Sequence, residues 1–213
     1  PDITAPQPIK GNHKAVIDEK ELAHLLRRTW RLTKDFPRTR IRTELALKLS
    51  AYIYQRPGEM QSLRWESVDF ENRYLSFKAS KTNQDHIVPL SRQAIELIQA
   101  LQPLTGNKQF VFYNHSTAKP LSNNALLSAI RTMGYTGKMT GHGFRGLAST
   151  TLHEQGYMHD AIEIQLAHTV GNAVSQAYNH AQHLERRTIM MQDWADFIDG
   201  LRGKLDPYLS IKS

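Results

Sequence analysis

The hydrophobic pattern of this chain changes its period in one place, and this change narrows the folds that it can adopt. Short segments rich in β-branched and aromatic residues, with polar turns between them, occupy 68–70, 74–78 and 86–90. Before and after them, apolar residues recur at the three- and four-residue spacing of amphipathic helices. The sequence therefore predicts a mostly α fold with a small three-stranded antiparallel sheet, an α+β architecture.

Capping residues and prolines bound the expected helices. Asp18 is a candidate N-cap for a helix that runs to about Thr33, and Ser91 for one that runs to about Leu101. A proline in the first turn favours a short helix that begins at Pro57. Every element after the apolar piece at 110–112 is expected to be helical. The remaining helices are expected over about 39–54, 57–64, 123–133, 142–155, 159–167, 172–179 and 184–201.

Length and composition exclude several classes of protein. The chain has 213 residues, a length typical of one domain. It contains no cysteine, which excludes disulfides, thiolate zinc sites, iron–sulfur clusters and cysteine nucleophiles. No apolar stretch approaches the roughly 18 residues of a membrane span, so no membrane partner is expected. Twenty-seven Lys and Arg against 20 Asp and Glu give a formal net charge of +7, which is consistent with a nucleic-acid partner, although many basic proteins are simply soluble.

Basic residues concentrate around the turn between the first two expected helices. Seven of them stand between residues 27 and 42, against a single acid, Asp35. They could form one positive ridge that contacts the phosphates spaced along a DNA duplex, or merely a solvated turn. The candidate DNA-binding residues on this ridge, which also contains Lys34, are Arg27, Arg28, Arg31, Arg38, Arg40 and Arg42.

Six further residues stand where helical patterning does not require a basic or nucleophilic side chain. Each alone also fits a structural role, such as an arginine at a helix end, a packed histidine or a core tyrosine. Two of them, His142 and Arg145, are three residues apart and therefore share one face at the start of a helix. In chain order the six are Arg56, Lys81, His142, Arg145, His168 and Tyr178.

This ordered set resembles the active site of the tyrosine recombinases, the phage-integrase family. The flanking sequence is similar as well, in QRPGEMQSLRW around Arg56, HIVPLS after the lysine hairpin, TGHGFRGLASTTLHEQG around the H-x-x-R step, and IQLAH. The segment YNH from Tyr178, followed by LERRTIMMQDWADFI, looks like the prophage and genomic-island branch. The resemblance covers about 18–201 and departs in two places, with Ala167 where glycine is common and His180 where arginine is frequent.

The resemblance implies the tyrosine-recombinase catalytic-domain fold and a DNA strand transfer that uses neither metal nor nucleotide. Tyr178 would attack the scissile phosphorus to give a 3′-phosphotyrosyl bond and a free 5′-hydroxyl. Arg56 and Arg145 would bind the nonbridging oxygens through their forked donors. His142 would take the proton from Tyr178 or orient it, and His168 would donate a hydrogen bond to a phosphate oxygen.

The lysine and the acidic residues receive their roles from the same resemblance. Lys81 would be the general acid for the 5′-oxygen, with Lys78 as the alternative because it lies in the same hairpin. Glu59 would hold an arginine in place rather than take part in the chemistry. No cofactor or metal is expected, since the sequence has no carboxylate cluster like that of a two-metal nuclease and no HExxH motif. Chance grouping is the interpretation given to His153, Glu154, His159, Asp160, His180 and His183.

The resemblance also implies a division of the chain and a set of partners. Residues 1–17, which contain three prolines, are interpreted as a linker from a missing N-terminal DNA-binding domain. Residues 18–202 would be the catalytic domain, and 203–213 a C-terminal tail that docks on its own domain or on a neighbouring subunit. Expected partners are double-stranded DNA carrying attachment sites, further copies of the chain in a tetramer on DNA, and DNA-bending accessory proteins, all in the cytoplasm of a bacterium.

The implied function is that of a site-specific recombinase, an integrase that integrates or excises a mobile element. One alternative is a type IB topoisomerase-like strand transferase, which uses a similar set of groups. The other is a noncatalytic DNA-binding module of the same fold. The presence of all six residues argues against the module, since a domain under no catalytic demand need not keep them.

Overall fold

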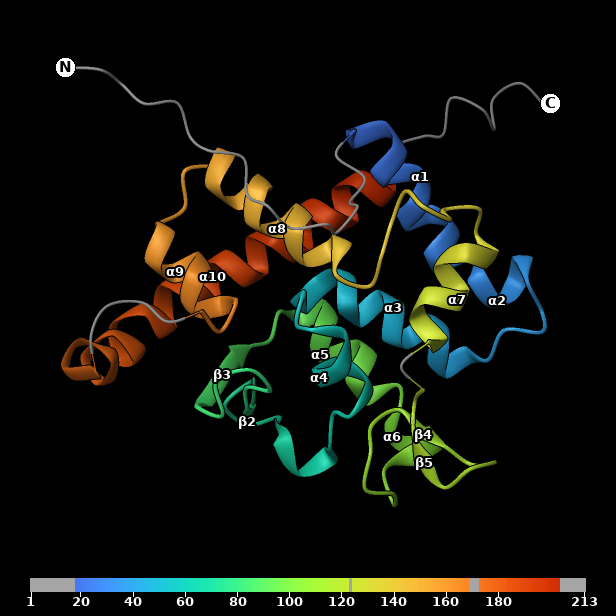
Figure 1. The fold of residues 1–213 in the computed structure, drawn as a ribbon, viewed down its shortest axis with the longest axis horizontal. Coiled ribbons are helices and arrows are strands. Elements are labelled where there is room, and N and C mark those ends of the chain that lie inside the picture. The colour runs from blue at the N-terminus through green and yellow to red at the C-terminus, as the bar shows by residue number, and fades with distance from the viewer. Residues whose placement is uncertain (1–17, 123, 169–172, 204–213) are drawn as a thin grey trace.

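The computed structural model (Figure 1) describes most of the chain, and of residues 173–182 it describes the backbone alone. The expected linker over 1–17 lies outside the described residues, as does the expected tail apart from Gly203. The described ranges are 18–122, 124–168 and 173–203.

Four helices precede the sheet. Asp18 caps the first of them, as expected, because its Oδ1 accepts a hydrogen bond from the N–H of Glu21 at 2.9 Å. The single helix expected to continue to Thr33 is instead two helices, since the backbone leaves helical geometry at Arg31. The four are α1 (Glu19–Trp30), α2 (Leu32–Asp35), α3 (Ile41–Ile53) and α4 (Pro57–Gln61).

The three-stranded antiparallel sheet is present where the sequence predicts it, in the order β1–β2–β3. In its register Leu75 lies opposite Val88, and both side chains are buried, whereas the next residue, Ser76, is exposed. This alternation packs one face of the sheet on the core and leaves the other to solvent. A short 3-10 helix (Trp65–Ser67) leads into β1 (Val68–Asp69), β2 (Tyr74–Lys78) and β3 (Asp85–Pro89).

A second antiparallel sheet follows, so the expectation of helices alone after 110–112 is wrong. Strand β4 (Tyr113–Asn114) pairs with β5 (Lys119–Pro120), with Tyr113 opposite Pro120. Strands of two residues are too short to show alternation, and a proline does not favour a strand, so the sequence pattern does not reveal them. The described fold is mostly α with two small sheets.

Six helices lie among and after these strands in the described part of the chain, and one is longer than expected. Helix α10 runs unbroken for 31 residues, where two helices over 172–179 and 184–201 were expected. Residues 180–183 read His-Ala-Gln-His, without the glycine or proline that would break a helix. Despite this length, none of the described helices is apolar enough to cross a bilayer. The six are α5 (Arg92–Gln99), α6 (Gln102–Thr105), α7 (Ala125–Thr132), α8 (Gly143–Glu154), α9 (His159–Gln165) and α10 (Ala173–Gly203).

Helix α3 lies at the centre of the fold, where it packs against α1, α5, α7 and α10 (Figure 1). Trp194 of α10 is fully buried against it and donates a hydrogen bond from Nε1 to the carbonyl of Ala51 at 2.8 Å. The ring of Tyr54, just after α3, meets Trp194 edge to face with centroids 5.7 Å apart. These contacts fix the end of α3, and the loop that follows it, against the last helix.

Candidate active site

The sharp turn between α3 and α4 sets the position of Arg56. Tyr54 adopts the left-handed conformation, with φ 39° and ψ 37°, and its N–H donates to the carbonyl of Ser50 at 3.0 Å. The next residue, Gln55, is buried and donates from Nε2 to the carbonyl of Gln165 in α9 at 3.0 Å. Arg56 then occupies the N-cap of α4, on a turn anchored to both α3 and α9.

Glu59 joins Arg56 to the hairpin between β2 and β3. Its Oε1 accepts from Nη1 of Arg56 at 3.1 Å, and from the N–H and hydroxyl of Ser80 at 3.0 and 2.9 Å. Its Oε2 accepts from the N–H of Arg56 at 3.1 Å. Glu59 is only 8% exposed, so the arginine compensates a largely buried negative charge. The expected contact between Glu59 and an arginine is therefore present, and it extends to the hairpin.

The start of α8 brings the H-x-x-R step beside α4. His142 is the N-cap of α8, and Arg145 follows within the first turn. Gly141 lies directly against Pro57, because a Cβ atom built on Gly141 would stand 3.0 Å from Cγ of the proline. A larger residue at 141 would therefore require the Pro57 ring or the backbone before α8 to shift by a few tenths of an ångström.

Both guanidinium groups converge on the carboxyl end of α9. Arg145 donates from Nη2 to the carbonyl of Leu166, and Arg56 donates from Nη2 to the carbonyl of Ala167 at 3.5 Å. The end of a helix carries partial negative charge, which favours cations there. Burial, followed by the charge of Arg56, lowers the pKa of Arg145 to about 10, so the two guanidinium groups are close enough to repel each other. An anion bound between them would relieve this repulsion.

Ala167, which stands where glycine is common in the family pattern, has an unusual backbone conformation. It adopts φ 49°, in the left-handed region that costs an ordinary residue about 1–2 kcal/mol relative to the right-handed one. Glycine adopts this conformation without strain, which is a physical reason for glycine to be common before the histidine. The alanine in this chain adopts the left-handed conformation and carries its strain.

His168 connects Arg145 to an acidic residue of α9. Its Nε2 lies 3.1 Å from Nη2 of Arg145, and its Nδ1 lies 2.7 Å from Oε2 of Glu163. Because arginine can only donate, Nε2 is the acceptor, and the ring proton is on Nδ1 and is donated to Glu163. The side chain of His168 is 44% exposed, so the ring reaches solvent while both nitrogens are engaged.

The two candidate lysines differ in their surroundings. Lys78 ends β2 and forms an ion pair with Asp85 across the hairpin, with Nζ 2.9 Å from Oδ1. Lys81 lies in the turn between β2 and β3, next to the residue that Glu59 holds, and is exposed. Lys81 has no hydrogen bond or ion pair with any residue that the structure describes, so its ammonium group is available to a ligand.

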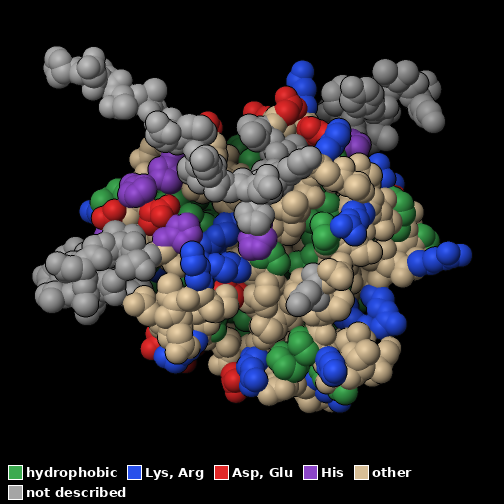
Figure 2. All heavy atoms as spheres, in the orientation of Figure 1, with side chains coloured by type: hydrophobic (Ala, Val, Ile, Leu, Met, Phe, Trp, Pro, Cys, Tyr) green, Lys and Arg blue, Asp and Glu red, His purple; other side chains and the backbone are tan. Residues whose placement is uncertain are grey.

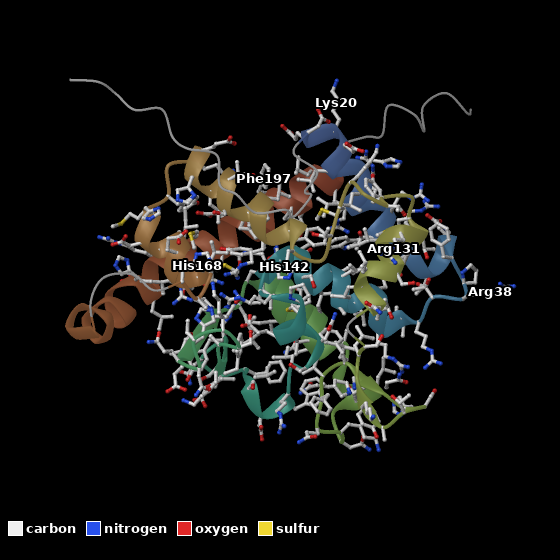
Figure 3. The ribbon with its side chains drawn as sticks, in the orientation of Figure 1. Lys20, Arg38, Arg131, His142, His168 and Phe197 are labelled. Carbon is white, nitrogen blue, oxygen red and sulfur yellow. The ribbon has the colours of Figure 1, made fainter. Side chains whose placement is uncertain are left out.

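The remaining two candidates are Tyr178 and His142. Tyr178 lies in the first turns of α10, and its side chain is outside the described residues. His142 and His168 lie on one face of the molecule (Figure 3), and Figure 2 shows Lys and Arg side chains gathered between two histidines there. The described structure therefore brings Arg56, Arg145 and His168 into one cluster, with His142 beside it.

The candidate DNA-binding arginines form a separate group around α2. Six arginines make up this group: Arg27 and Arg28 in the last turn of α1, Arg31 just after it, Arg38 and Arg40 between α2 and α3, and Arg42 in the first turn of α3. Several have partners within the protein. Arg31 pairs with Asp35 at 3.3 Å, the guanidinium of Arg28 stacks 5.5 Å from the ring centroid of Phe36, and Arg40 and Arg42 both reach Oδ1 of Asn114. Exposed members of the group are Arg31, Arg38 and Arg40.

Sequence reasoning missed Arg187, a fully buried arginine in α10 that supports the site. It donates from Nε and Nη2 to Oε1 of Gln165 at 3.1 and 2.7 Å, and from Nη2 to the carbonyl of Ile87. Burial lowers its pKa to about 10. Arg187 thus ties β3, after the lysine hairpin, to the end of α9 where the two other arginines meet. Its only sequence signal was a charged residue inside an otherwise apolar helix face.

Comparison with known proteins identifies a matching family and several similar proteins. The sequence profile of the phage integrase family matches residues 15–185. The integrase of Shigella phage Sf6 is 44% identical over 159 residues, which cover 73% of this chain and 41% of that protein. The prophage integrase IntS of Escherichia coli K12 is 43% identical over 159 residues, again with 73% and 41% covered. The chain spans about two fifths of the length of these relatives.

Solved structures share the fold at low sequence identity. The integrase of mycobacterium phage Brujita aligns with a TM-score of 0.62 at 17% identity, over 89% of this chain and 61% of that one. A lambda integrase tetramer bound to a Holliday junction aligns with a TM-score of 0.55 at 19% identity, over 81% of this chain and 50% of that one. With a family profile that matches most of its length and an arginine–histidine cluster in a shared fold, this chain belongs to the phage integrase family, the tyrosine recombinases.

Proposed function

We propose that this chain is the catalytic part of a site-specific DNA recombinase, an integrase that cleaves and rejoins DNA through a 3′-phosphotyrosyl intermediate. The observation that carries the proposal is the meeting of Arg56, Arg145 and His168 at the carboxyl end of α9. Two guanidinium groups side by side form a binding site for an anion, and a DNA phosphate is such an anion. The names of the relatives, which are phage and prophage integrases, support the same function.

The scissile phosphate would bind between the two arginines. Their Nη2 groups now donate to the carbonyls of Leu166 and Ala167, which are weaker acceptors than a charged phosphate oxygen. Nη1 of Arg145 is buried and has no hydrogen-bond partner in the described part of the chain, so it remains for a substrate oxygen. Negative charge grows on the nonbridging oxygens in the transition state, and fixed guanidinium groups stabilise it there most strongly.

The transfer itself would exchange one phosphoester for another. The phenolic oxygen of Tyr178 attacks the phosphorus, and the bond from phosphorus to the 5′-oxygen breaks. The tyrosine proton passes to His142, and Lys81 donates a proton to the departing 5′-oxygen. The free 5′-hydroxyl of a second strand then reverses these steps and releases the tyrosine. The hydrogen bonds from Ser80 to Glu59 support this assignment, since they hold the residue before Lys81 beside Arg56.

His168 would donate to a phosphate oxygen only if Nε2 carried a proton. In the structure Nε2 accepts from Arg145, so the neutral ring has no N–H to offer there. When the phosphate draws Arg145 away, a second proton on Nε2 would turn the ring into a donor. The carboxylate of Glu163, 2.7 Å from Nδ1, would stabilise the imidazolium that results.

The partners follow from the same proposal. Double-stranded attachment-site DNA would contact the arginine group around α2 as well as the cluster, with steep salt dependence. Further copies of the chain would assemble on DNA as a tetramer, the state that lambda integrase adopts on a Holliday junction. DNA-bending accessory proteins would assist, and relatives in bacterial prophages favour a bacterial cytoplasmic location. Residues 1–17 would be a linker to an N-terminal DNA-binding domain, 18–202 the catalytic domain and 203–213 a docking tail.

A nicked suicide substrate carrying candidate attachment DNA tests the proposal. Cleavage near the nick releases a short fragment, so the covalent protein–DNA adduct accumulates and appears on a denaturing gel. We expect an adduct that forms in excess EDTA, because the cations are side chains. Failure of every candidate site to give an adduct would favour a noncatalytic module, and relaxation of site-free supercoiled plasmid would favour a topoisomerase. Loss of the adduct in EDTA with recovery in Mg²⁺ would overturn the mechanism.

A further inference from the structure

Two histidines and a glutamate meet at the junction of α8 and α9, outside the arginine cluster. His153 lies in the last turn of α8, and His159 begins α9. Glu163 follows one turn later on the same face of α9. Each contributes one ligand atom, and these atoms all lie within 4.8 Å of one another. Figure 2 shows histidine side chains gathered with acidic ones at the surface over these helices.

The distances suit a transition-metal ion. Nε2 of His153 lies 3.0 Å from Nδ1 of His159. Two nitrogens that each stand about 2.0–2.1 Å from one tetrahedral ion are roughly 3.3 Å apart, so both rings are close to the separation that an ion needs. Glu163 would complete the set with a small adjustment of its side chain. Two imidazoles and one carboxylate form a three-ligand set for Zn²⁺ that leaves a fourth position for water.

A second observation points to a ligand at this place. Nδ1 of His153 lies 2.7 Å from the carbonyl oxygen of Ser149, one turn back in α8. A carbonyl can only accept, so the proton of this ring is on Nδ1, and in the neutral ring the lone pair of Nε2 faces the cluster, where it accepts from Nδ1 of His159. A bound ion would replace that proton, and His159 would carry its own proton on Nε2. Metal-binding histidines are held in this way, with the far nitrogen donating to a carbonyl or carboxylate. The exposure of His153 and His159 leaves the site open to ions from solvent.

We infer that His153, His159 and Glu163 form a binding site for one Zn²⁺ ion or a chemically similar transition-metal ion. The site does not depend on the proposed recombinase function. It touches the active-site cluster at one point, because Oε2 of Glu163 also accepts from Nδ1 of His168. The ion would take an oxygen of this carboxylate, and so compete with or share the contact that orients His168. From the sequence, His153 and His159 are interpreted as part of a chance grouping, of which Glu163 is not a member.

Metal affinity of the purified protein tests the inference without any DNA. Zn²⁺ is titrated in competition with a chromophoric chelator, and Co²⁺ is added separately, since its visible absorption reports a tetrahedral nitrogen–oxygen site. We expect one equivalent of each ion to bind, with no competition from excess Mg²⁺. His153→Ala, His159→Ala and Glu163→Gln should each weaken Zn²⁺ binding by at least about tenfold, the lower end of the effect of losing even an outer partner.

The control is His115→Ala, which removes an exposed histidine between β4 and β5, far from α8 and α9 in the sequence. It should bind Zn²⁺ as tightly as the unaltered chain. Thermal unfolding distinguishes a variant that has lost the metal site from one that has failed to fold. The metal-free variants should still unfold in a single cooperative transition, lowered only by the hydrogen bonds that each substitution removes, and Zn²⁺ should raise the melting temperature only where the site is intact. Equal affinity in all four variants, or a Co²⁺ spectrum that His153→Ala leaves unchanged, would overturn the inference.

Discussion

Arg145 donates a hydrogen bond from Nη2 to Nε2 of His168 across 3.1 Å, and this contact determines which nitrogen of the imidazole carries its proton. The arginine is buried and the histidine is partly exposed, so the pair connects the interior to the face on which His142 also lies. A phosphate bound at this face would interact with the positive charge of Arg145 and with the forked arrangement of its N–H donors. A lysine substitution separates the two contributions.

Arg145→Lys, and separately Arg56→Lys, keeps the positive charge and removes the fork of donors. If the arginines stabilise the transition state, the rate of adduct formation should fall by about 10² to 10³, by analogy with the loss of an oxyanion-hole donor, while duplex affinity changes little. The measurement pairs a gel time course with a binding titration. Arg92→Lys is the control, because the guanidinium of this exposed residue forms ion pairs with Glu96 and Asp196 at the surface. Parallel losses of affinity and rate would mean that the arginines merely hold DNA.

Glu59→Gln tests the link between Arg56 and the lysine hairpin. The carboxylate of Glu59 accepts from Arg56 and from Ser80. The variant should therefore lose about 1.5–3 kcal/mol of unfolding free energy, the range for hydrogen bonds to charged groups. It should also cleave DNA more slowly. Ser80→Ala removes only the hydroxyl contact and should cost about 0.5–1.5 kcal/mol. Chemical denaturation gives both values. A Glu59→Gln protein with unaltered stability and cleavage would show that the link has no function.

The two lysines of the hairpin can be separated by the leaving group. Lys81→Ala should slow cleavage of ordinary DNA, yet a substrate with sulfur in place of the bridging 5′-oxygen should restore the rate, because a thiolate leaves without a proton donor. Lys78→Ala loses an exposed ion pair with Asp85 and should behave like the unaltered chain on both substrates. Rescue by sulfur in Lys78→Ala instead would transfer the role of general acid to Lys78.

Much of the fold follows from local pattern, and the failures have local causes. The hairpin of β2 and β3 was predictable because two short segments rich in β-branched and aromatic residues stand on either side of a polar turn. The pair β4 and β5 was not, since two residues cannot show a period. The continuity of α10 was also missed, because a break was placed at polar residues that are compatible with a helix.

The candidate site was predictable as a list of residues but not as a network. Order along the chain and the family pattern name Arg56, Arg145 and His168, and the described structure places these three together. Their roles remain predictions, as does that of Tyr178. The contacts that orient them join residues far apart in sequence, such as Arg187 with Ile87, and no local pattern encodes such a pair.

Ala167→Gly tests whether the turn before His168 stores strain. Glycine relieves about 1–2 kcal/mol of left-handed strain and loses about 0.5–1 kcal/mol through the entropy of the unfolded chain. The variant should therefore gain between about 0 and 1.5 kcal/mol in stability and keep its activity. Ala161→Gly, at a buried position inside α9, should instead lose stability by about 0.5–1 kcal/mol or more. Equal destabilisation of the two variants would refute the strain at Ala167.

Tyr178→Phe removes one hydroxyl and almost no volume, so it isolates the proposed nucleophile. A core tyrosine would lose at most one hydrogen bond, about 0.5–1.5 kcal/mol, and the protein would keep its activity. If Tyr178 is the nucleophile, the variant should fold and bind DNA normally but form no covalent adduct. No other side chain in YNH supplies an attacking oxygen of the same kind.

The matched control is Tyr157→Phe, which removes a hydroxyl that donates to Oδ2 of Asp193 at 2.6 Å. Burial and then this aspartate raise the pKa of Tyr157 to about 12, so its hydroxyl holds its proton at neutral pH and is a poor nucleophile. The control should therefore lose a little stability and keep the adduct, the reverse of the outcome for Tyr178→Phe. Labelled suicide DNA on a denaturing gel compares the two directly. An adduct of full intensity in Tyr178→Phe would refute the nucleophile and, with it, the strand-transfer mechanism proposed for this chain.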